Sequence, residues 1–191
     1  MGQVKLFHGK IQSSLNPTME SALSTDAGNS DQALLYSAAA RGFLEACRGL
    51  VLIAEPKPMN HWPAFYLNLG YALELASKAV LSSKGVSNAE LKRIGHDLEK
   101  LTKLIEAYGI SIDDSAKKVI MMLNPDFRGQ RLRYLFGSDN FRLPSDPKQA
   151  ESIVAKYLDT MIAHAESQTR SFPRHPRARV LPPNPAVPAE S

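Results

Sequence analysis

A histidine beside an aspartate is the first candidate for chemistry in this sequence. It lies in the stretch IGHDLEKL, residues 94–101, where Gly95, His96 and Asp97 precede leucines at helical spacing. Because histidine titrates near neutral pH, it can act as a general acid or base or as a metal ligand. No second histidine, cysteine or close carboxylate pair stands at metal-ligand spacing beside it, so the sequence predicts no metal site.

The orientation of His96 depends on where the helix around it begins. If one helix continues over residues 87–105, His96 points away from its leucines and lies on an exposed or interfacial face. Because Gly95 interrupts this run, a new helix starting near Asp97 is an equal alternative, and His96 could then turn inward. We interpret the triplet as architectural, with Asp97 as a helix cap and His96 hydrogen-bonded to a neighbouring element. The alternative is a ligand-binding or catalytic His96, with Arg93 as the nearest arginine.

Residues 126–142 form a second candidate, because arginines and aromatic residues interleave there. The arginines are Arg128, Arg131, Arg133 and Arg142, and the aromatic residues are Phe127, Tyr134, Phe136 and Phe141. Guanidinium groups bind phosphate through two hydrogen bonds and aromatic faces stack on bases, so the mixture suits RNA or a nucleotide. The alternative, favoured for a charged loop, is that the aromatics are anchored in the core and the arginines pair with Asp126, Asp139 or Glu74.

The elements that must position these candidates are helical. Apolar residues at helical spacing predict about five helices, over residues 31–54, 63–84, 87–105, 113–123 and 146–170. No stretch alternates convincingly between polar and apolar residues as a strand would, so the expected fold is an all-α bundle. Turn residues exclude long regular structure between the last two helices.

Local signals mark several helix ends. Gly85 is expected to end the second helix in a left-handed conformation. Ser87 and Glu90 have the spacing of a capping box, and Glu74 and Lys78 form a favourable pair one turn apart. Asp146 precedes Pro-Lys-Gln, which combines a cap with a proline at the first helical position.

Composition divides the chain into three parts. Residues 1–30 are polar and predict a flexible N-terminal segment, residues 31–168 contain the bundle, and residues 169–191 predict a disordered tail rich in proline and arginine. The tail's arginines could add non-specific affinity for nucleic acid.

Length, net charge, cysteine content and the length of the apolar runs narrow the class of protein. The 191 residues carry a formal net charge of +4, which permits but does not require an anionic partner. Cys47 is the only cysteine and lies among apolar residues, which predicts a buried side chain and suits a reducing compartment. No apolar run approaches the roughly 20 residues that a membrane span needs, and no signal peptide is recognisable. We therefore expect a cytoplasmic location and no membrane partner.

Residues 72–101, ALELASKAVLSSKGVSNAELKRIGHDLEKL, resemble the HEPN domain family of small helical-bundle proteins. The stretch contains Glu-Leu-Ala-x-Lys-Ala, a turn that ends in glycine, and Gly-His-Asp-Leu with a leucine three positions further on. RLRY, residues 131–134, resembles an Arg-Tyr pair that often follows downstream. The resemblance is firm over residues 64–108 and weaker as far as residue 165.

The resemblance implies a helical bundle that self-associates as a homodimer. Some HEPN proteins are metal-independent RNases, often toxins, with an Arg-x(4–6)-His motif whose two side chains meet at a dimer cleft. Others lack the motif and act as binding or scaffold modules. Neither His61, His96 nor His164 has an arginine at that distance upstream. A literal match from Arg170 to His175 lies in the proline-rich tail, which cannot hold a base within reach of its target.

The resulting hypothesis is a HEPN-like interaction module without a catalytic centre, which dimerises and binds RNA or a nucleotide through the arginine-aromatic loop. One alternative is a HEPN-type, toxin-like endoribonuclease with an atypical site that combines His96 with Arg93, Arg131 or Arg133. A second alternative is a scaffold that binds only another protein, such as an antitoxin-like partner. No cofactor is expected, since the sequence contains no phosphate-binding glycine loop, dinucleotide fingerprint or nucleophile elbow.

Overall fold

The fold is an all-α bundle, as the sequence predicted. The computed structural model describes residues 17–54, 62–134, 141 and 143–170, and within them it has seven helices and no strand. The helices are α1 (Pro17–Ala54), α2 (Trp62–Ser83), α3 (Asn88–Ile94), α4 (Leu98–Ala107), α5 (Asp114–Arg128), α6 (Arg131–Tyr134) and α7 (Pro147–Arg170). Among the described residues, no helix is both long enough and apolar enough to cross a membrane.

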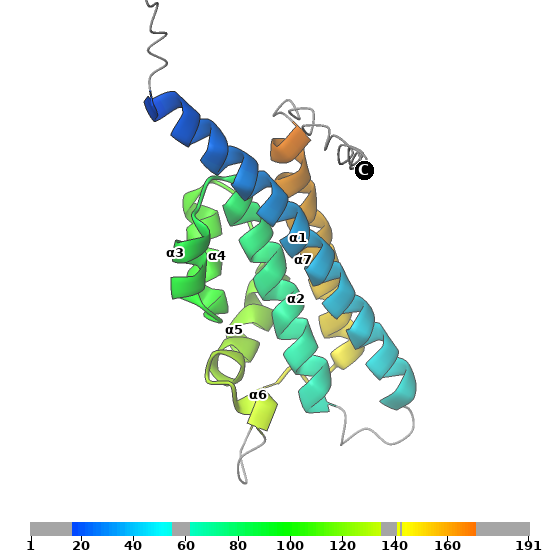
Figure 1. Ribbon diagram of the computed structural model, residues 1–191. Coiled ribbons are helices and arrows are strands. Elements are labelled where there is room, and N and C mark those ends of the chain that lie inside the picture. Colours follow the sequence, from blue (N-terminus) through cyan, green and yellow to red (C-terminus); the bar gives the residue numbers. More distant parts are fainter. Residues whose placement is uncertain (1–16, 55–61, 135–140, 142, 171–191) are drawn as a thin grey trace, which may run out of the picture.

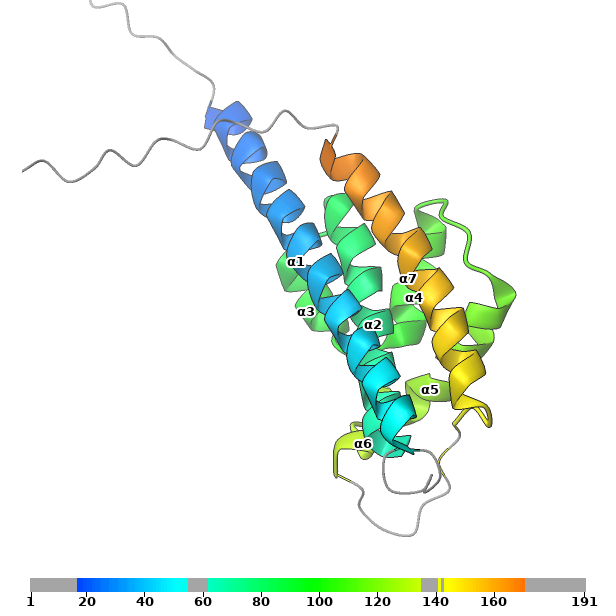
Figure 2. The ribbon, with the colours of Figure 1, turned by 90° about the vertical axis from the view of Figure 1, so that its right-hand side faces the viewer.

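Helix α2 lies at the centre of the bundle. The three long helices α1, α2 and α7 run side by side, and the shorter helices α3 to α6 cover the remaining side of α2 (Figures 1 and 2). Helix α2 is buried on most of its surface, because its sequence is apolar almost all round. Side chains on α2 can therefore meet residues of α1, α4, α5, α6 and α7.

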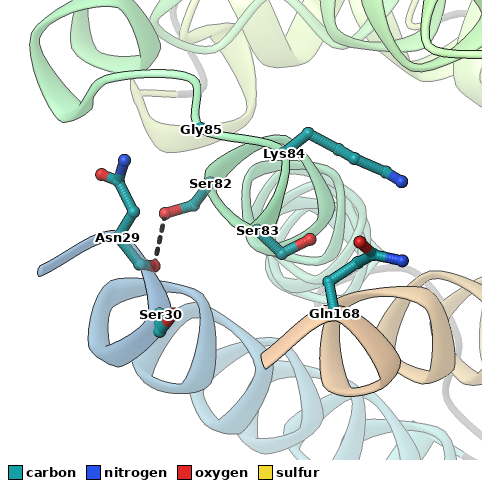
Figure 3. A pocket seen from close by; sticks show the side chains of 7 residues that line it. All are labelled: Asn29, Ser30, Ser82, Ser83, Lys84, Gly85 and Gln168. Carbon is teal, nitrogen blue, oxygen red and sulfur yellow. Dashed lines mark hydrogen bonds between the residues drawn. The ribbon is translucent and has the colours of Figure 1, made fainter. Parts of the chain in front are cut away.

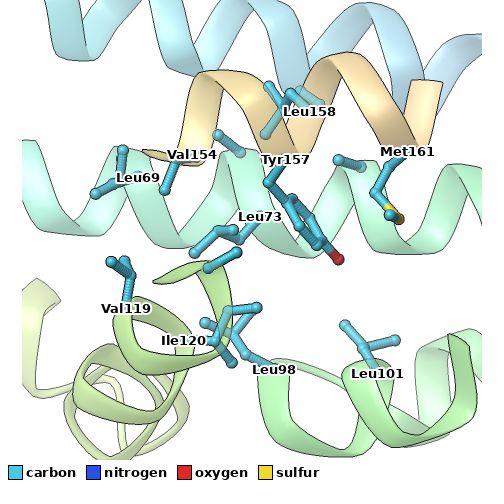
Figure 4. Close-up of a cluster of buried hydrophobic side chains, with 14 of the residues drawn as sticks. Leu69, Leu73, Leu98, Leu101, Val119, Ile120, Val154, Tyr157, Leu158 and Met161 are labelled. Atoms are coloured by element: carbon cyan, nitrogen blue, oxygen red, sulfur yellow. The ribbon is translucent and has the colours of Figure 1, made fainter. Parts of the chain in front are cut away.

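The core lies between α2, α4, α5 and α7. The side chains labelled in Figure 4 are Leu69, Leu73, Leu98, Leu101, Val119, Ile120, Val154, Tyr157, Leu158 and Met161. All are buried, and each fully buried leucine or isoleucine contributes about 1.5–3 kcal/mol relative to an exposed one. The Tyr157 hydroxyl within this core shares a hydrogen bond of 2.7 Å with Ser77 Oγ, which satisfies both buried groups.

The predicted helix ends are confirmed at several positions. Gly85 has a left-handed φ of 86°, and the Ser87 side chain accepts a hydrogen bond from the Glu90 N–H at 3.2 Å. The side chain of Asp146 accepts a hydrogen bond from the Gln149 N–H at 3.0 Å. Caps could be predicted because they depend on residues three or four positions apart.

Helix α3 and helix α4 are separate, so the second of the two alternatives for His96 is the correct one. Gly95 has a φ of 66°, a conformation that glycine adopts at little cost, and its N–H donates to the carbonyl of Leu91. Asp97 then caps α4, accepting a hydrogen bond from the N–H of Lys100 at 3.2 Å. His96 lies between the two helices.

Two predicted boundaries are wrong. Helix α1 begins at Pro17, well before the expected start at residue 31. No proline interrupts the chain between Pro17 and residue 54, and Gly28 alone does not end a helix. Helix α5 continues beyond Leu123 and through Pro125 to Arg128. Burial of Phe127 holds this last turn, so tertiary packing outweighs the local preference of proline to interrupt a helix.

Cys47 is buried in α1, as the sequence predicted. Burial, with a smaller contribution from the nearby carboxylate of Glu151, raises the pKa of its thiol to about 12. At about pH 8 the native protein is therefore expected not to react with dithiobis-nitrobenzoate, and the unfolded protein to react fully. Absorbance of the released thiolate measures this, and rapid reaction of the native protein would show that the thiol is accessible.

Candidate functional site

The candidate site is built around Glu74, a buried carboxylate on α2. Only 3% of Glu74 is exposed. Its Oε1 accepts a hydrogen bond from Lys78 Nζ at 2.5 Å, and its Oε2 lies 2.8 Å from His96 Nδ1. Lys78 is only 8% exposed and comes one turn later on the same helix, at the spacing that predicted the pair. His96 therefore hydrogen-bonds a neighbouring element, as the architectural interpretation expected.

The bond to Glu74 fixes how the imidazole of His96 is presented. A carboxylate oxygen accepts, so Nδ1 carries a proton, and in the neutral ring Nε2 is an acceptor. The side chain of His96 is 32% exposed, whereas that of Glu74 is enclosed. This is the arrangement in which a carboxylate orients a histidine for proton transfer or for binding a hydrogen-bond donor.

An aromatic cluster surrounds the imidazole. The ring of His96 meets Tyr71 at 6.0 Å between centroids and Phe127 at 5.7 Å, both nearly edge to face. Tyr71 and Phe127 also meet edge to face, at 5.2 Å. Gly70 makes room for this packing, because a Cβ atom at that position would lie 2.3 Å from the Phe127 ring.

Arg133 from the arginine-rich segment lies on the same aromatic cluster. Its guanidinium carbon is 5.3 Å from the centroid of the Tyr71 ring, a cation–π arrangement. Tyr71 thus contacts both His96 and Arg133. The two candidates that the sequence suggested separately, the His96 triplet and the arginines, meet at a residue that the sequence did not single out.

Two further arginines are anchored by buried carboxylates. Arg128 Nη1 lies 3.2 Å from Asp97 Oδ2, and Arg131 Nη1 lies 2.9 Å from Asp126 Oδ1. The pairing of Arg131 with Asp126 agrees with the alternative interpretation of this segment, in which it folds over the core and its arginines pair with carboxylates. The Arg128 side chain is nevertheless 63% exposed, so most of its donors face solvent.

Asp97 joins the candidate site to α5. Besides capping α4, its carboxylate receives Arg128 and lies 3.5 Å from Asn124 Nδ2. The side-chain amide oxygen of Asn124, Oδ1, accepts a hydrogen bond from the backbone N–H of Leu98 at 2.9 Å. The Gly95-His96-Asp97 triplet therefore connects α3, α4 and α5 with α2.

Some predicted site residues are not brought together. Arg93 is strongly exposed and lies 3.9 Å from Glu90 on its own helix. The structure places Tyr134 as the last residue of α6. The side chains of Tyr134 and Arg170, and the whole of residues His61, Phe136, Asp139, Arg142 and His175, lie outside the described residues. His164 is exposed on α7.

A polar pocket lies at another part of the bundle, where the end of α2 meets α1 and α7 (Figure 3). Its volume is about 260 Å³, and its lining residues are Asn29, Ser30, Ser82, Ser83, Lys84, Gly85 and Gln168. Ser82 Oγ donates to the Asn29 carbonyl at 2.9 Å. The pocket is about two helical turns from Glu74 along α2 and contains none of the candidate residues, so it is not part of the candidate site.

The side chains of the described segments form no cluster of three or more histidine, cysteine, aspartate or glutamate residues that could hold a metal ion. Comparison of the chain with models of protein families, with curated proteins and with solved structures finds no match.

Proposed function

We propose that this protein is a HEPN-like interaction module that binds RNA on the surface formed by Tyr71, His96, Arg128, Arg131 and Arg133, which we call the arginine-tyrosine surface. The observation that carries the proposal is the position of Arg133 over Tyr71, beside the partly exposed His96. This brings together a cation, an aromatic ring and a hydrogen-bonding imidazole, which are groups that proteins use to bind single-stranded RNA.

The charges of this surface favour a phosphate-bearing ligand. Arg128 and Arg131 are each held by a buried carboxylate, which fixes part of the guanidinium, and the Arg128 side chain is 63% exposed. An arginine anchored in this way loses less conformational freedom on binding than a free one. Arg133 is exposed and contacts an aromatic face, so its charge is available to a phosphate.

The resemblance to HEPN domains adds two expectations to this proposal. The first is self-association as a homodimer, and the second is a protein partner of the antitoxin type, in a cytoplasmic setting. Both stay predictions here. A protein that binds only such a partner would be a scaffold, and it would show no affinity for RNA.

The first test is the affinity of the full chain for a labelled single-stranded RNA at two salt concentrations, measured by fluorescence anisotropy. Binding is expected to weaken with salt, and Arg133→Ala to weaken it about tenfold or more, since each phosphate or base contact contributes about 1–3 kcal/mol. Lys103→Ala is the control, because Lys103 is an exposed cation of α4 paired with Glu99. Equal affinity of wild type and Arg133→Ala would contradict the proposal, and competition by a mononucleotide would identify a nucleotide ligand.

A second candidate function is RNA cleavage, favoured by the hydrogen bond between Glu74 and His96 Nδ1. A histidine oriented by a buried carboxylate can act as a general base without a metal ion. The same RNA, incubated in EDTA, would then be degraded by wild type and by His164→Ala but not by His96→Ala. Intact RNA with salt-dependent binding supports the non-catalytic module.

A further inference from the structure

His96 uses one ring nitrogen inside the protein and leaves the other open to a ligand. Its Nδ1 is bonded to the buried carboxylate of Glu74 at 2.8 Å. Within the described residues, Nε2 makes no hydrogen bond and is not among the enclosed atoms, and the side chain is partly exposed. A polar atom that is reachable and unoccupied on a proposed binding surface is a candidate for ligand recognition.

The charges around Glu74 decide which role Nε2 can play. Lys78 Nζ lies 2.5 Å from Glu74 Oε1 and supplies the positive charge that balances this carboxylate. The imidazole is therefore not needed as a second counter-ion, and it donates from Nδ1 in its neutral form. A neutral imidazole that donates from Nδ1 has only an acceptor at Nε2. The open nitrogen thus fits a ligand group that carries a proton, and it does not fit a phosphate oxygen.

RNA offers two kinds of proton-bearing group, the N–H groups of its bases and the 2′-hydroxyl of its ribose. The 2′-hydroxyl is bonded to the ribose carbon next to the one that carries the 3′ phosphate. A strand whose phosphates are held by arginines therefore brings its 2′-hydroxyls close to those arginines. The base edges lie further from the phosphates, so an acceptor beside a phosphate-binding arginine is better placed for the hydroxyl.

Two arginines lie beside His96 in this way. Arg133 is positioned over the ring of Tyr71, which itself meets the imidazole edge to face. Arg128 is bonded to the carboxylate of Asp97, the residue that follows His96 in the chain. Each guanidinium group is thus one side chain away from the imidazole. A phosphate bound by either arginine can place the adjoining 2′-hydroxyl within reach of Nε2.

We infer that His96 makes the arginine-tyrosine surface selective for RNA over DNA, because its Nε2 accepts a hydrogen bond from a 2′-hydroxyl group. The inference rests on the proposed function and names the group of the RNA that the surface reads. Phosphate contacts and stacking do not by themselves distinguish the two nucleic acids, since both carry phosphates and bases. No bond is broken in this contact, which separates it from the proton removal that RNA cleavage would need.

The test compares three labelled strands of one sequence: RNA, its 2′-fluoro counterpart and DNA. The fluorine atom keeps an RNA-like sugar but cannot donate a hydrogen bond. At about pH 8, where imidazole is neutral, the full chain is expected to bind RNA about tenfold more tightly than the other two strands, as loss of one hydrogen bond implies. Fluorescence anisotropy in EDTA measures the three affinities. Equal affinity for the three strands would overturn the inference and leave the proposed RNA binding in place.

Variants of His96 test whether this residue reads the hydroxyl. His96→Phe keeps an aromatic ring against Tyr71 and Phe127 but has no acceptor, so it should bind RNA and the 2′-fluoro strand within about twofold of each other. His96→Ala should give the same result without the ring, and circular dichroism checks the fold of both variants. His164→Ala, at an exposed position of α7, is the matched control and should retain the full preference. A preference that survives in His96→Phe would overturn the inference.

Arg133→Ala separates this inference from the proposed function. It should weaken the binding of RNA and of the 2′-fluoro strand alike and leave their ratio unchanged. An affinity that does not depend on Arg133 contradicts the proposed function, whereas an absent ratio between the two strands contradicts only the role of His96. A chain that binds none of the three strands would overturn both.

Discussion

Replacing Glu74 by alanine is expected to lower the free energy of unfolding by about 3–5 kcal/mol, because it leaves the ammonium group of Lys78 buried without its partner. The bond to His96 Nδ1 is lost in the same change, so the imidazole also loses its fixed orientation. Urea unfolding followed by circular dichroism measures the change in stability.

The matched control for this prediction is another glutamate–lysine pair one turn apart. Glu99 and Lys103 of α4 have the same spacing, with an N–O distance of 2.8 Å, but both are exposed. Glu99→Ala is expected to change stability by less than about 0.5 kcal/mol, as exposed pairs usually do. The double variant Glu74→Met, Lys78→Met should recover most of the loss, since apolar residues can replace a buried ion pair. Equal effects of Glu74→Ala and Glu99→Ala would contradict the burial of this carboxylate.

Gly70→Ala is expected to destabilise the protein by about 1–3 kcal/mol, although alanine is the better helix former. The added methyl would lie 2.3 Å from the Phe127 ring, and the ring must move to accept it. Because Phe127 contacts both Tyr71 and His96, we expect the same variant to weaken RNA binding on the arginine-tyrosine surface.

Gly28→Ala provides the control for Gly70→Ala. It lies in α1 with nothing within 4 Å of the added atom, so it should leave stability unchanged or raise it by up to about 1 kcal/mol. Adding Phe127→Leu to Gly70→Ala should cost less than the sum of the two single changes, since the shorter side chain makes room for the methyl. Additive costs in thermal unfolding would show that the two residues do not meet.

The sequence could predict features that depend on neighbours one helical turn apart. The caps at Ser87, Asp97 and Asp146 and the pair of Glu74 with Lys78 belong to this group. The end of α5 belongs to the opposite group. There the burial of Phe127, which depends on a residue 57 positions earlier, decides whether the helix continues beyond Pro125.

The candidate site shows the same division. His96 could be selected from the local pattern, and a hydrogen bond to another element could be expected for it. Its partner Glu74 is 22 positions away, and Tyr71, which joins His96 to Arg133, is one of two tyrosines in the largely buried helix α2. A tyrosine on a buried helix was the available signal, because its hydroxyl group needs a hydrogen-bond partner or a position that faces solvent. Which residues it meets is set by how α2, α5 and α6 pack.

Photo-crosslinking to an RNA that contains 4-thiouridine tests the central claim most directly, since it identifies the residues that touch the bound strand. If RNA binds the arginine-tyrosine surface, mass spectrometry should find the crosslinks on peptides that contain Tyr71 or residues 127–133, and Arg133→Ala should reduce them. Crosslinks confined to residues 171–191 or to α1, unchanged by Arg133→Ala, would contradict the account.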